Sequence, residues 1–118
     1  MIISLPWPSS KLSPNARLHW KAKIGPKQDA KRIAGWVTVS TPGFYQKRDE
    51  LAAFDRPIHV EMIFYPPDKR RRDDDNCIGQ MKAARDAIAE ALRIDDSRFR
   101  VTYKFCDPCK PGKVEVVL

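Results

Sequence analysis

The sequence contains no apolar run that approaches the roughly 20 residues needed to span a bilayer. Its first residues lack the basic region and the long apolar stretch of a signal peptide, so we expect a cytoplasmic protein with no membrane partner. Only three cysteines are present, and this odd number, which cannot all pair within one chain, suits a reducing compartment. Repeats and low-complexity segments are lacking as well. With 42% hydrophobic and 31% charged residues, the composition argues against both a membrane protein and a disordered chain.

The length of 118 residues corresponds to one domain, residues 1–118, because domains usually contain roughly 100–200 residues. Such a chain buries about two-thirds of the surface that its unfolded form exposes, which is enough for one hydrophobic core. Lysine and arginine number 22 against 15 for aspartate and glutamate, which gives a formal net charge of +7. This excess predicts a polyanionic partner, nucleic acid before an anionic membrane.

Hydrophobic periodicity predicts both strands and helices. The predicted strands cover residues 2–7, 58–65, 98–105 and 114–118, and the predicted helices cover 26–37 and 76–92. Residues 41–57 are expected to be irregular or partly helical. The last two strands flank a short loop that is typical of a hairpin. We therefore expect an α+β fold in which a small mixed or antiparallel sheet packs with helices.

Acidic residues are concentrated in one part of the chain, since eight of the fifteen lie between Asp68 and Asp96. If the stretch is extended, the side chains of Asp73 and Asp75 project to the same side. Two carboxylates at one spot repel each other, so either one takes a proton or a cation lies between them. Mg²⁺ suits such a site because it takes hard oxygen ligands and few carboxylates. The turn at Asp95 and Asp96 could add a third carboxylate; helix caps and solvated turns are the alternative for both stretches.

Basic residues adjoin these acids and also fill the N-terminal segment. We expect both groups to hold DNA phosphates, with bidentate arginine contacts in the first and no base recognition in the second. The first group is Lys69, Arg70, Arg71 and Arg72, and the second is Lys11, Arg17, Lys21 and Lys23 together with the uncharged Asn15. A solvated loop is the alternative for the first group. In the second, the neighbouring Trp20 could stack on a base, or lie buried under a loop.

Lys82 lies two helical turns beyond Asp75 and therefore shares roughly the same helix face. It could place a positive charge near a scissile phosphate or protonate the leaving oxygen. A surface ion pair with Asp86, four residues further on, is the alternative.

Several of these stretches resemble the RusA family of Holliday-junction resolvases, the crossover junction endodeoxyribonucleases. The opening Leu5-Pro6-Trp7-Pro8-Ser9 resembles that family's first strand and turn, and residues 67–76, which contain Asp73-x-Asp75-Asn76, resemble its central motif. Residues 82–88 resemble its motif-bearing helix, and Asp95-Asp96 its second acidic element. The stretch between the central motif and Lys82 is longer than in the family's pattern.

The resemblance implies a RusA-like endonuclease domain over nearly the whole chain. By this likeness, Asp73, Asp75 and Asp96 are catalytic carboxylates that bind a metal, and Lys82 is the catalytic lysine. The cofactor would be Mg²⁺, with Mn²⁺ as a substitute, and the partner a four-way DNA junction that a homodimer nicks in recombination and repair. Two alternatives stay open. One is a non-catalytic nucleic-acid-binding accessory protein whose acids cap a helix, and the other is a metal nuclease for other branched DNA.

Cys106 and Cys109 have the spacing of a redox or zinc pair. A structural zinc needs about four ligands, and the other candidates, Cys77, His19 and His59, are far apart in the sequence. We therefore expect a reduced loop here, with zinc or redox chemistry as the alternative.

Overall fold

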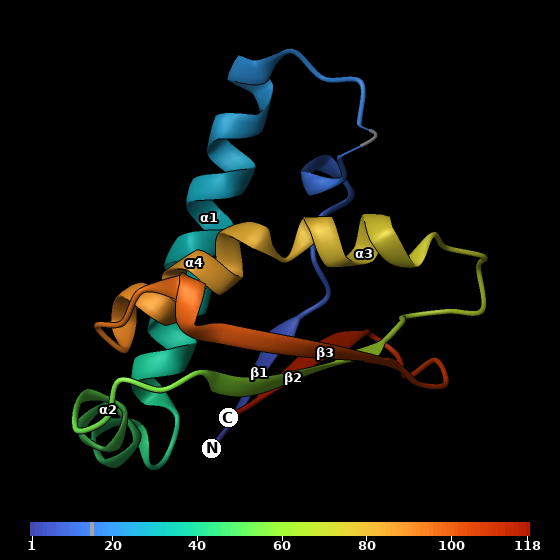
Figure 1. The fold of residues 1–118 in the computed structure, drawn as a ribbon. Coiled ribbons are helices and arrows are strands. Elements are labelled where there is room, and N and C mark those ends of the chain that lie inside the picture. Colours follow the sequence, from blue (N-terminus) through green and yellow to red (C-terminus); the bar gives the residue numbers. More distant parts are fainter. Residues whose placement is uncertain (15) are drawn as a thin grey trace.

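The computed structural model describes residues 1–14 and 16–118, and it contains a four-stranded mixed sheet with helices packed on one face (Figure 1). In chain order the elements are β1 (Ile2–Pro6), η1 (Ser10–Leu12), α1 (Trp20–Ser40), α2 (Phe44–Ala52), β2 (Ile58–Tyr65), α3 (Asp74–Gln80), α4 (Lys82–Ala91), η2 (Asp96–Arg98), β3 (Phe99–Phe105) and β4 (Lys113–Val117). The strand order across the sheet is β1-β4-β2-β3. Strand β2 pairs parallel with β3, whereas β4 pairs antiparallel with β1 and β2. The predicted α+β class is thereby confirmed.

The core lies between one face of the sheet and the helices. Alternate residues of β2, including Val60, Met62 and Phe64, are buried, whereas His59 and Glu61 on the opposite face are exposed. This is the period-two pattern of a strand with one covered face. Helix α4 supplies the other side of the core through an apolar stripe; its buried members are Ala83, Ala84, Ala87, Ile88 and Ala89.

The predicted hairpin between the last two strands is wrong. Strand β4 inserts between β1 and β2, and β3 lies at the edge of the sheet beside β2. The alternation of Phe99, Val101, Tyr103 and Phe105 correctly predicted a strand, but periodicity carries no information about which strand is the neighbour. The parallel pairing follows from the helical crossover through α3 and α4, because such crossovers join parallel strands.

The first long helix is longer than predicted. We expected it over residues 26–37 with Pro26 in the first turn, but α1 begins at Trp20, where the side chain of His19 accepts a hydrogen bond from the Lys21 backbone N–H. Pro26 therefore lies inside the helix, where it removes one backbone hydrogen bond. Polar and basic residues hid this extension, because the first two turns carry no apolar stripe.

The second predicted helix, 76–92, is two helices. Helix α3 begins at Asp74, and the chain turns at Met81, whose backbone lies at φ −92° and ψ 0°, before α4 begins at Lys82. Met81 itself is buried, and so are Ile88 and Leu92 of the predicted apolar stripe. The break falls in the stretch that is longer than the pattern of the resembling family.

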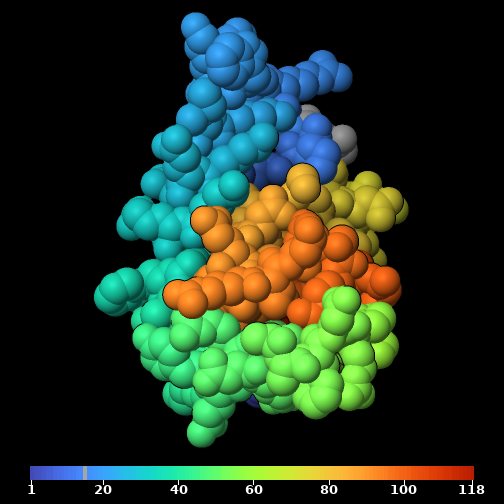
Figure 2. Space-filling model, turned by 60° about the vertical axis from the view of Figure 1, so that its left-hand side comes forward, coloured from blue at the N-terminus to red at the C-terminus, as the bar shows by residue number. Residues whose placement is uncertain are grey.

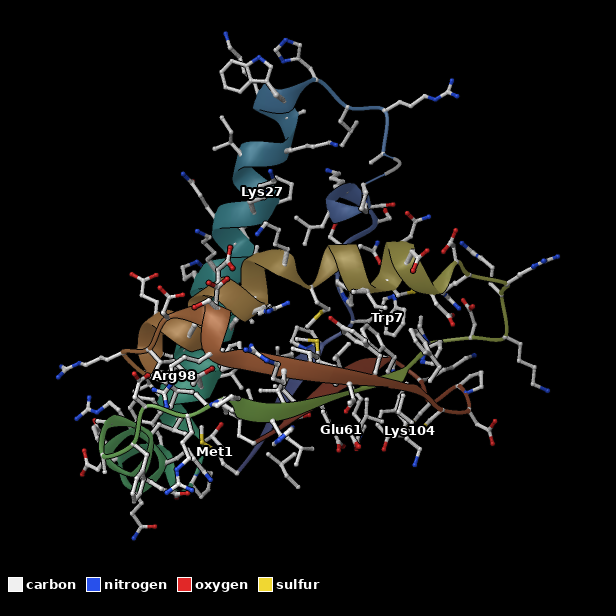
Figure 3. The ribbon with its side chains drawn as sticks, viewed as in Figure 1. Met1, Trp7, Lys27, Glu61, Arg98 and Lys104 are labelled. Carbon is white, nitrogen blue, oxygen red and sulfur yellow. The ribbon has the colours of Figure 1, made fainter. Side chains whose placement is uncertain are left out.

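Arg98 joins η2 to the distant end of α2 (Figure 3). Its guanidinium donates hydrogen bonds to three backbone oxygens, those of Leu51 (3.2 Å), Phe54 (2.6 Å) and Arg56 (3.0 Å). Charged donors contribute more to stability than neutral ones, and carbonyls left without a partner cost free energy. Arg98 therefore fixes the segment between α2 and β2 against the start of β3.

We expect Arg98→Ala to lower the free energy of unfolding by about 1–3 kcal/mol, because these carbonyls lose a charged donor. Urea unfolding followed by circular dichroism measures the change. Arg100→Ala is the matched control, since Arg100 bonds only to the nearby oxygens of Ser97 and Phe99 and should cost less. Equal losses in the two variants would contradict a special role for Arg98.

Candidate nucleic-acid interface

The loop between β2 and α3 is shaped by an ion pair inside its basic run. The Arg72 guanidinium lies 2.8 Å from the Asp68 carboxylate and also donates to the backbone oxygens of Asp68 and Arg70. Its charge lies 5.4 Å from the Trp7 ring centroid, within the range of a cation–π contact. We predicted Arg72 as a DNA contact, but the structure commits its guanidinium to the loop itself.

The other basic residues of this loop face solvent. Lys69, Arg70 and Arg71 are exposed, and none of the three forms a side-chain ion pair in the part of the chain that the structure describes. The folded loop thus presents three positive charges next to the start of α3. This arrangement suits phosphate oxygens, which arginine forks bind bidentately.

Asp73 and Asp75 lie together at the start of α3. Asp73 is the N-cap residue, and its side chain accepts a hydrogen bond of 2.9 Å from the Asp75 backbone N–H. Asp73, Asp74 and Asp75 are all exposed. The capping interpretation is therefore correct for Asp73, yet a carboxylate has further acceptor sites that a cation could use. Two neighbouring carboxylates of this kind match the donor set that Mg²⁺ takes together with substrate phosphates.

The structure does not bring Asp96 to these two residues within one chain. The parallel register pairs Ile58 with Phe99 and Phe64 with Phe105, so Asp96 precedes β3 at the end where β2 begins. The loop to α3 leaves from the opposite end, about 20 Å away for seven strand residues. Helices α3 and α4 span this distance as they return over the sheet (Figure 1). In residues 1–14 and 16–118, no three His, Cys, Asp or Glu side chains are grouped so that they could hold a metal ion.

Lys82 and Asp96 instead border the same hollow, between the start of α4 and β3. Asp86 lines it too, and the Lys82 Nζ lies 3.8 Å from the Asp86 carboxylate. The predicted surface pair is thereby present, although Lys82 remains 79% exposed. The break at Met81 interrupts the helix face that Lys82 was expected to share with Asp75.

Of the predicted N-terminal DNA contacts, Lys11, Arg17 and Lys21 are exposed and Lys23 is half-buried. Lys11 lies on η1, Arg17 precedes α1, and Lys21 places its Nζ 5.5 Å from the Trp20 ring centroid. Asn15 lies outside the described residues. Trp20 is 64% exposed, so its burial under a loop, one of our two interpretations, is wrong.

Sequence reasoning named Lys23 as a phosphate contact but missed the rest of a second basic surface. Lys27 and Lys31, on α1, line a groove together with Lys23 and with Lys82 of α4. The signal was a lysine at every fourth position, which places three lysines on one helix face. It went unrecognised because the predicted helix began at residue 26, which split the stripe.

The three cysteines differ in their exposure. Cys77 is buried, and burial raises the pKa of its thiol. Cys106 is half-buried and Cys109 exposed, in a loop whose Cys109 backbone N–H donates to the Pro66 oxygen. The three thiols are free.

No known family's sequence profile matches the chain. The chain is similar to an uncharacterized protein of Xylella fastidiosa (strain Temecula1), with 38% identity over 104 residues that cover 82% of this chain. The chain spans 61% of that relative's length. No helix in the described residues is both long and apolar enough to cross a membrane.

The ion pair between Arg72 and Asp68 leads to a prediction about the pKa of Asp68. The Arg70 backbone N–H, and next the Arg72 side chain, hold the pKa of Asp68 below its ordinary value of 3.8. A lowered folded-state pKa stabilises the fold fully above the unfolded value, and this contribution is lost as the pH falls through the folded value. We expect Arg72→Ala to raise this pKa only part of the way to 3.8, because the Arg70 N–H remains. NMR titration of the Asp68 carboxyl carbon measures it.

Arg71→Ala serves as the control, since Arg71 is not among the groups that shift this carboxyl. An unchanged Asp68 titration in Arg72→Ala would show that the ion pair does not form in solution.

Proposed function

We propose that this protein is a Mg²⁺-dependent endonuclease that nicks branched DNA, with the four-way junction as its leading substrate. The observation that carries the proposal is the placement of Asp73 and Asp75 beside three exposed basic residues, Lys69, Arg70 and Arg71. An acidic focus beside phosphate-binding residues suits a site where a bound cation offsets the charge on a phosphate. The resemblance of residues 67–76 to the RusA central motif supports the same function.

In this proposal each residue has a distinct task. Asp73 and Asp75 hold Mg²⁺, and Arg70 and Arg71 orient the phosphodiester beside it. The chemistry that a bound Mg²⁺ would supply there is polarisation of a phosphoryl oxygen as a Lewis acid. Mg²⁺ commonly uses one or two carboxylates plus substrate phosphates, and Asp73 and Asp75 match that part of the ligand set.

Asp96 and Lys82 enter the proposal through a homodimer, which the resemblance implies. In a two-fold dimer, the end of the β2–β3 pair near Asp96 in one copy can face the opposite end of that pair in the other copy. Asp96 of one copy would then complete the site formed by Asp73 and Asp75 of the second copy. Lys82 borders the same hollow as Asp96 and would approach the departing oxygen from that side.

A non-catalytic nucleic-acid-binding protein is the second candidate. Two observations favour it: the Asp73 carboxylate caps α3, and Asp96 lies at the other end of the β2–β3 pair. The two candidates differ in one measurable property, which is nicking of DNA in the presence of Mg²⁺ or Mn²⁺.

We expect Asp75→Asn to reduce nicking of a four-way junction by more than about 100-fold, because the cation loses an anionic ligand. Binding to the junction should be retained or become tighter, since negative charge facing phosphates is removed. Gel assays of labelled junction, with and without Mg²⁺, measure both quantities. Asp74→Asn is the matched control, because it removes the same charge one residue away and should nick normally. Wild-type protein that binds four-way junctions and flap substrates but nicks neither in Mg²⁺ or Mn²⁺ would leave only the second candidate.

Mixing two inactive variants tests the role of Asp96. We expect Asp75→Asn and Asp96→Asn each to be inactive alone. After unfolding and refolding together, they should recover about a quarter of wild-type nicking, since half the dimers are mixed and each mixed dimer holds one intact site. If Asp75 and Asp96 of the same chain formed the site, the mixture would recover no nicking. Full activity of Asp96→Asn alone would remove Asp96 from the site.

A further inference from the structure

The groove that Lys23, Lys27, Lys31 and Lys82 line is here called the lysine groove. It lies between the N-terminal half of α1 and residues 12–14, which pack on the end of α3. It has a volume of about 370 Å³, and its basic residues are Lys23, Lys27, Lys31 and Lys82. Figure 2 shows the N-terminal half of α1 standing above the rest of the molecule, with α4 below it. One wall is the segment ending at Pro14, which packs tightly on Gly79: a Cβ at Gly79 would lie 2.5 Å from the Pro14 Cγ.

The groove exists because one face of α1 changes character along the helix. Towards the C-terminal end this face is apolar, with Ala34 buried against the core and Ala30 half-buried. One and two turns earlier the same face carries lysines, since residues four apart lie on one side of a helix. An apolar face there would continue the core, whereas lysines keep the space open to solvent and polar ligands.

The groove has an excess of positive charge. Among residues 1–14 and 16–118, no carboxylate lies within ion-pair distance of Lys23, Lys27 or Lys31. Its one acid, Asp86, is paired with Lys82. The three lysines of α1 follow one another at about 6 Å along the helix axis. A row of this kind fits a ligand with regularly repeated negative charges better than it fits a single anion.

Two neighbouring features match a nucleic acid in particular. Trp20, exposed on the same side of α1 one turn before Lys23, offers a ring on which a base can stack. An apolar hollow of about 380 Å³ adjoins the groove and shares Leu12 and Gln80 with it. Proteins that bind single strands without sequence preference place the phosphates against basic side chains and the bases against apolar or aromatic surface.

We propose that the lysine groove binds the sugar–phosphate backbone of a single nucleic-acid strand. Lys27 and Lys31 contact successive phosphates, and Lys23 extends the track towards Trp20. The proposal rests on the proposed function for the choice of DNA as the ligand. It adds a second contact surface, built from α1 and α4, to the basic loop beside Asp73 and Asp75. A concave, walled groove suits a strand, whereas a bilayer would need a flat or convex face.

The test is fluorescence anisotropy with a short labelled single strand and with a four-way junction, over a range of salt concentrations. The variant Lys27→Gln/Lys31→Gln should bind the single strand at least about tenfold more weakly at low salt. The slope of log K against log salt should be less steep by about 1.4, or 0.7 for each lost phosphate contact. The matched control is Lys104→Gln/Lys110→Gln, which removes the same charge from exposed positions elsewhere, with Lys104 on the far side of the sheet (Figure 3).

Weakening in the groove variant, with the control near wild type, supports the groove. Equal weakening in both variants would show that only net charge matters and would overturn it, and so would an unchanged groove variant. Inorganic polyphosphate that competes as well as DNA would reduce the site to a general polyanion site and overturn the strand assignment. Phosphatidylglycerol vesicles that bind in place of DNA would overturn it as well.

Nicking by the wild type is scored on the same junction. Binding that depends on the groove without nicking refutes the endonuclease and leaves the groove. If the wild type nicks the junction and the groove variant binds DNA normally, the groove proposal alone is refuted.

Discussion

Parallel pairing of β2 with β3 is the constraint on which the placement of every candidate group depends. A parallel pair needs a crossover, and here α3 and α4 carry the chain from the end of β2 back to the start of β3. Residues just after β2 and residues just before β3 are therefore separated by the length of the strands. Asp73 and Asp75 fall in the first class and Asp96 in the second. In the structure, the loop after β2 and helices α3 and α4 keep the two stretches apart.

The crossover also accounts for the basic surfaces. Because α4 packs on α1 and the sheet, the N-terminal half of α1 extends past the core, where η1 is its neighbour. Lysines on that half can face inward without the desolvation cost that a buried charge would carry. The loop after β2 is likewise outside the core, and its Arg72 is held by Asp68 and Trp7 so that the preceding cations face solvent. Both surfaces thus result from chain segments that the core does not cover.

The sequence predicted what depends on local periodicity and did not predict what depends on partners. Strand β2 was predicted with its observed bounds, and the apolar stripe of α4 was predicted from residues spaced by helical turns. The position of β4 between β1 and β2 was not predicted, because alternation in a strand is the same whatever its neighbour. The start of α1 at Trp20 was missed because polar turns give no stripe. The exposure of Trp20 and the contact of Arg72 with Trp7 depend on the tertiary structure, which no local pattern contains.

In the proposed function, the carboxylates at the start of α3 have two roles, which are to stabilise the helix and to bind a cation. Asp73 stabilises the helix by accepting the Asp75 N–H, and a negative charge there is also favourable to the helix dipole. A cation bound by Asp73 and Asp75 would weaken the dipole interaction, but it would leave the hydrogen bond in place because it can use other acceptor positions. Asp75 makes no side-chain hydrogen bond or ion pair among the described residues, so its carboxylate carries less of the folding requirement. In the proposed function, folding and cation binding would be separable at this helix start, since Asp73 would serve both and Asp75 only the second.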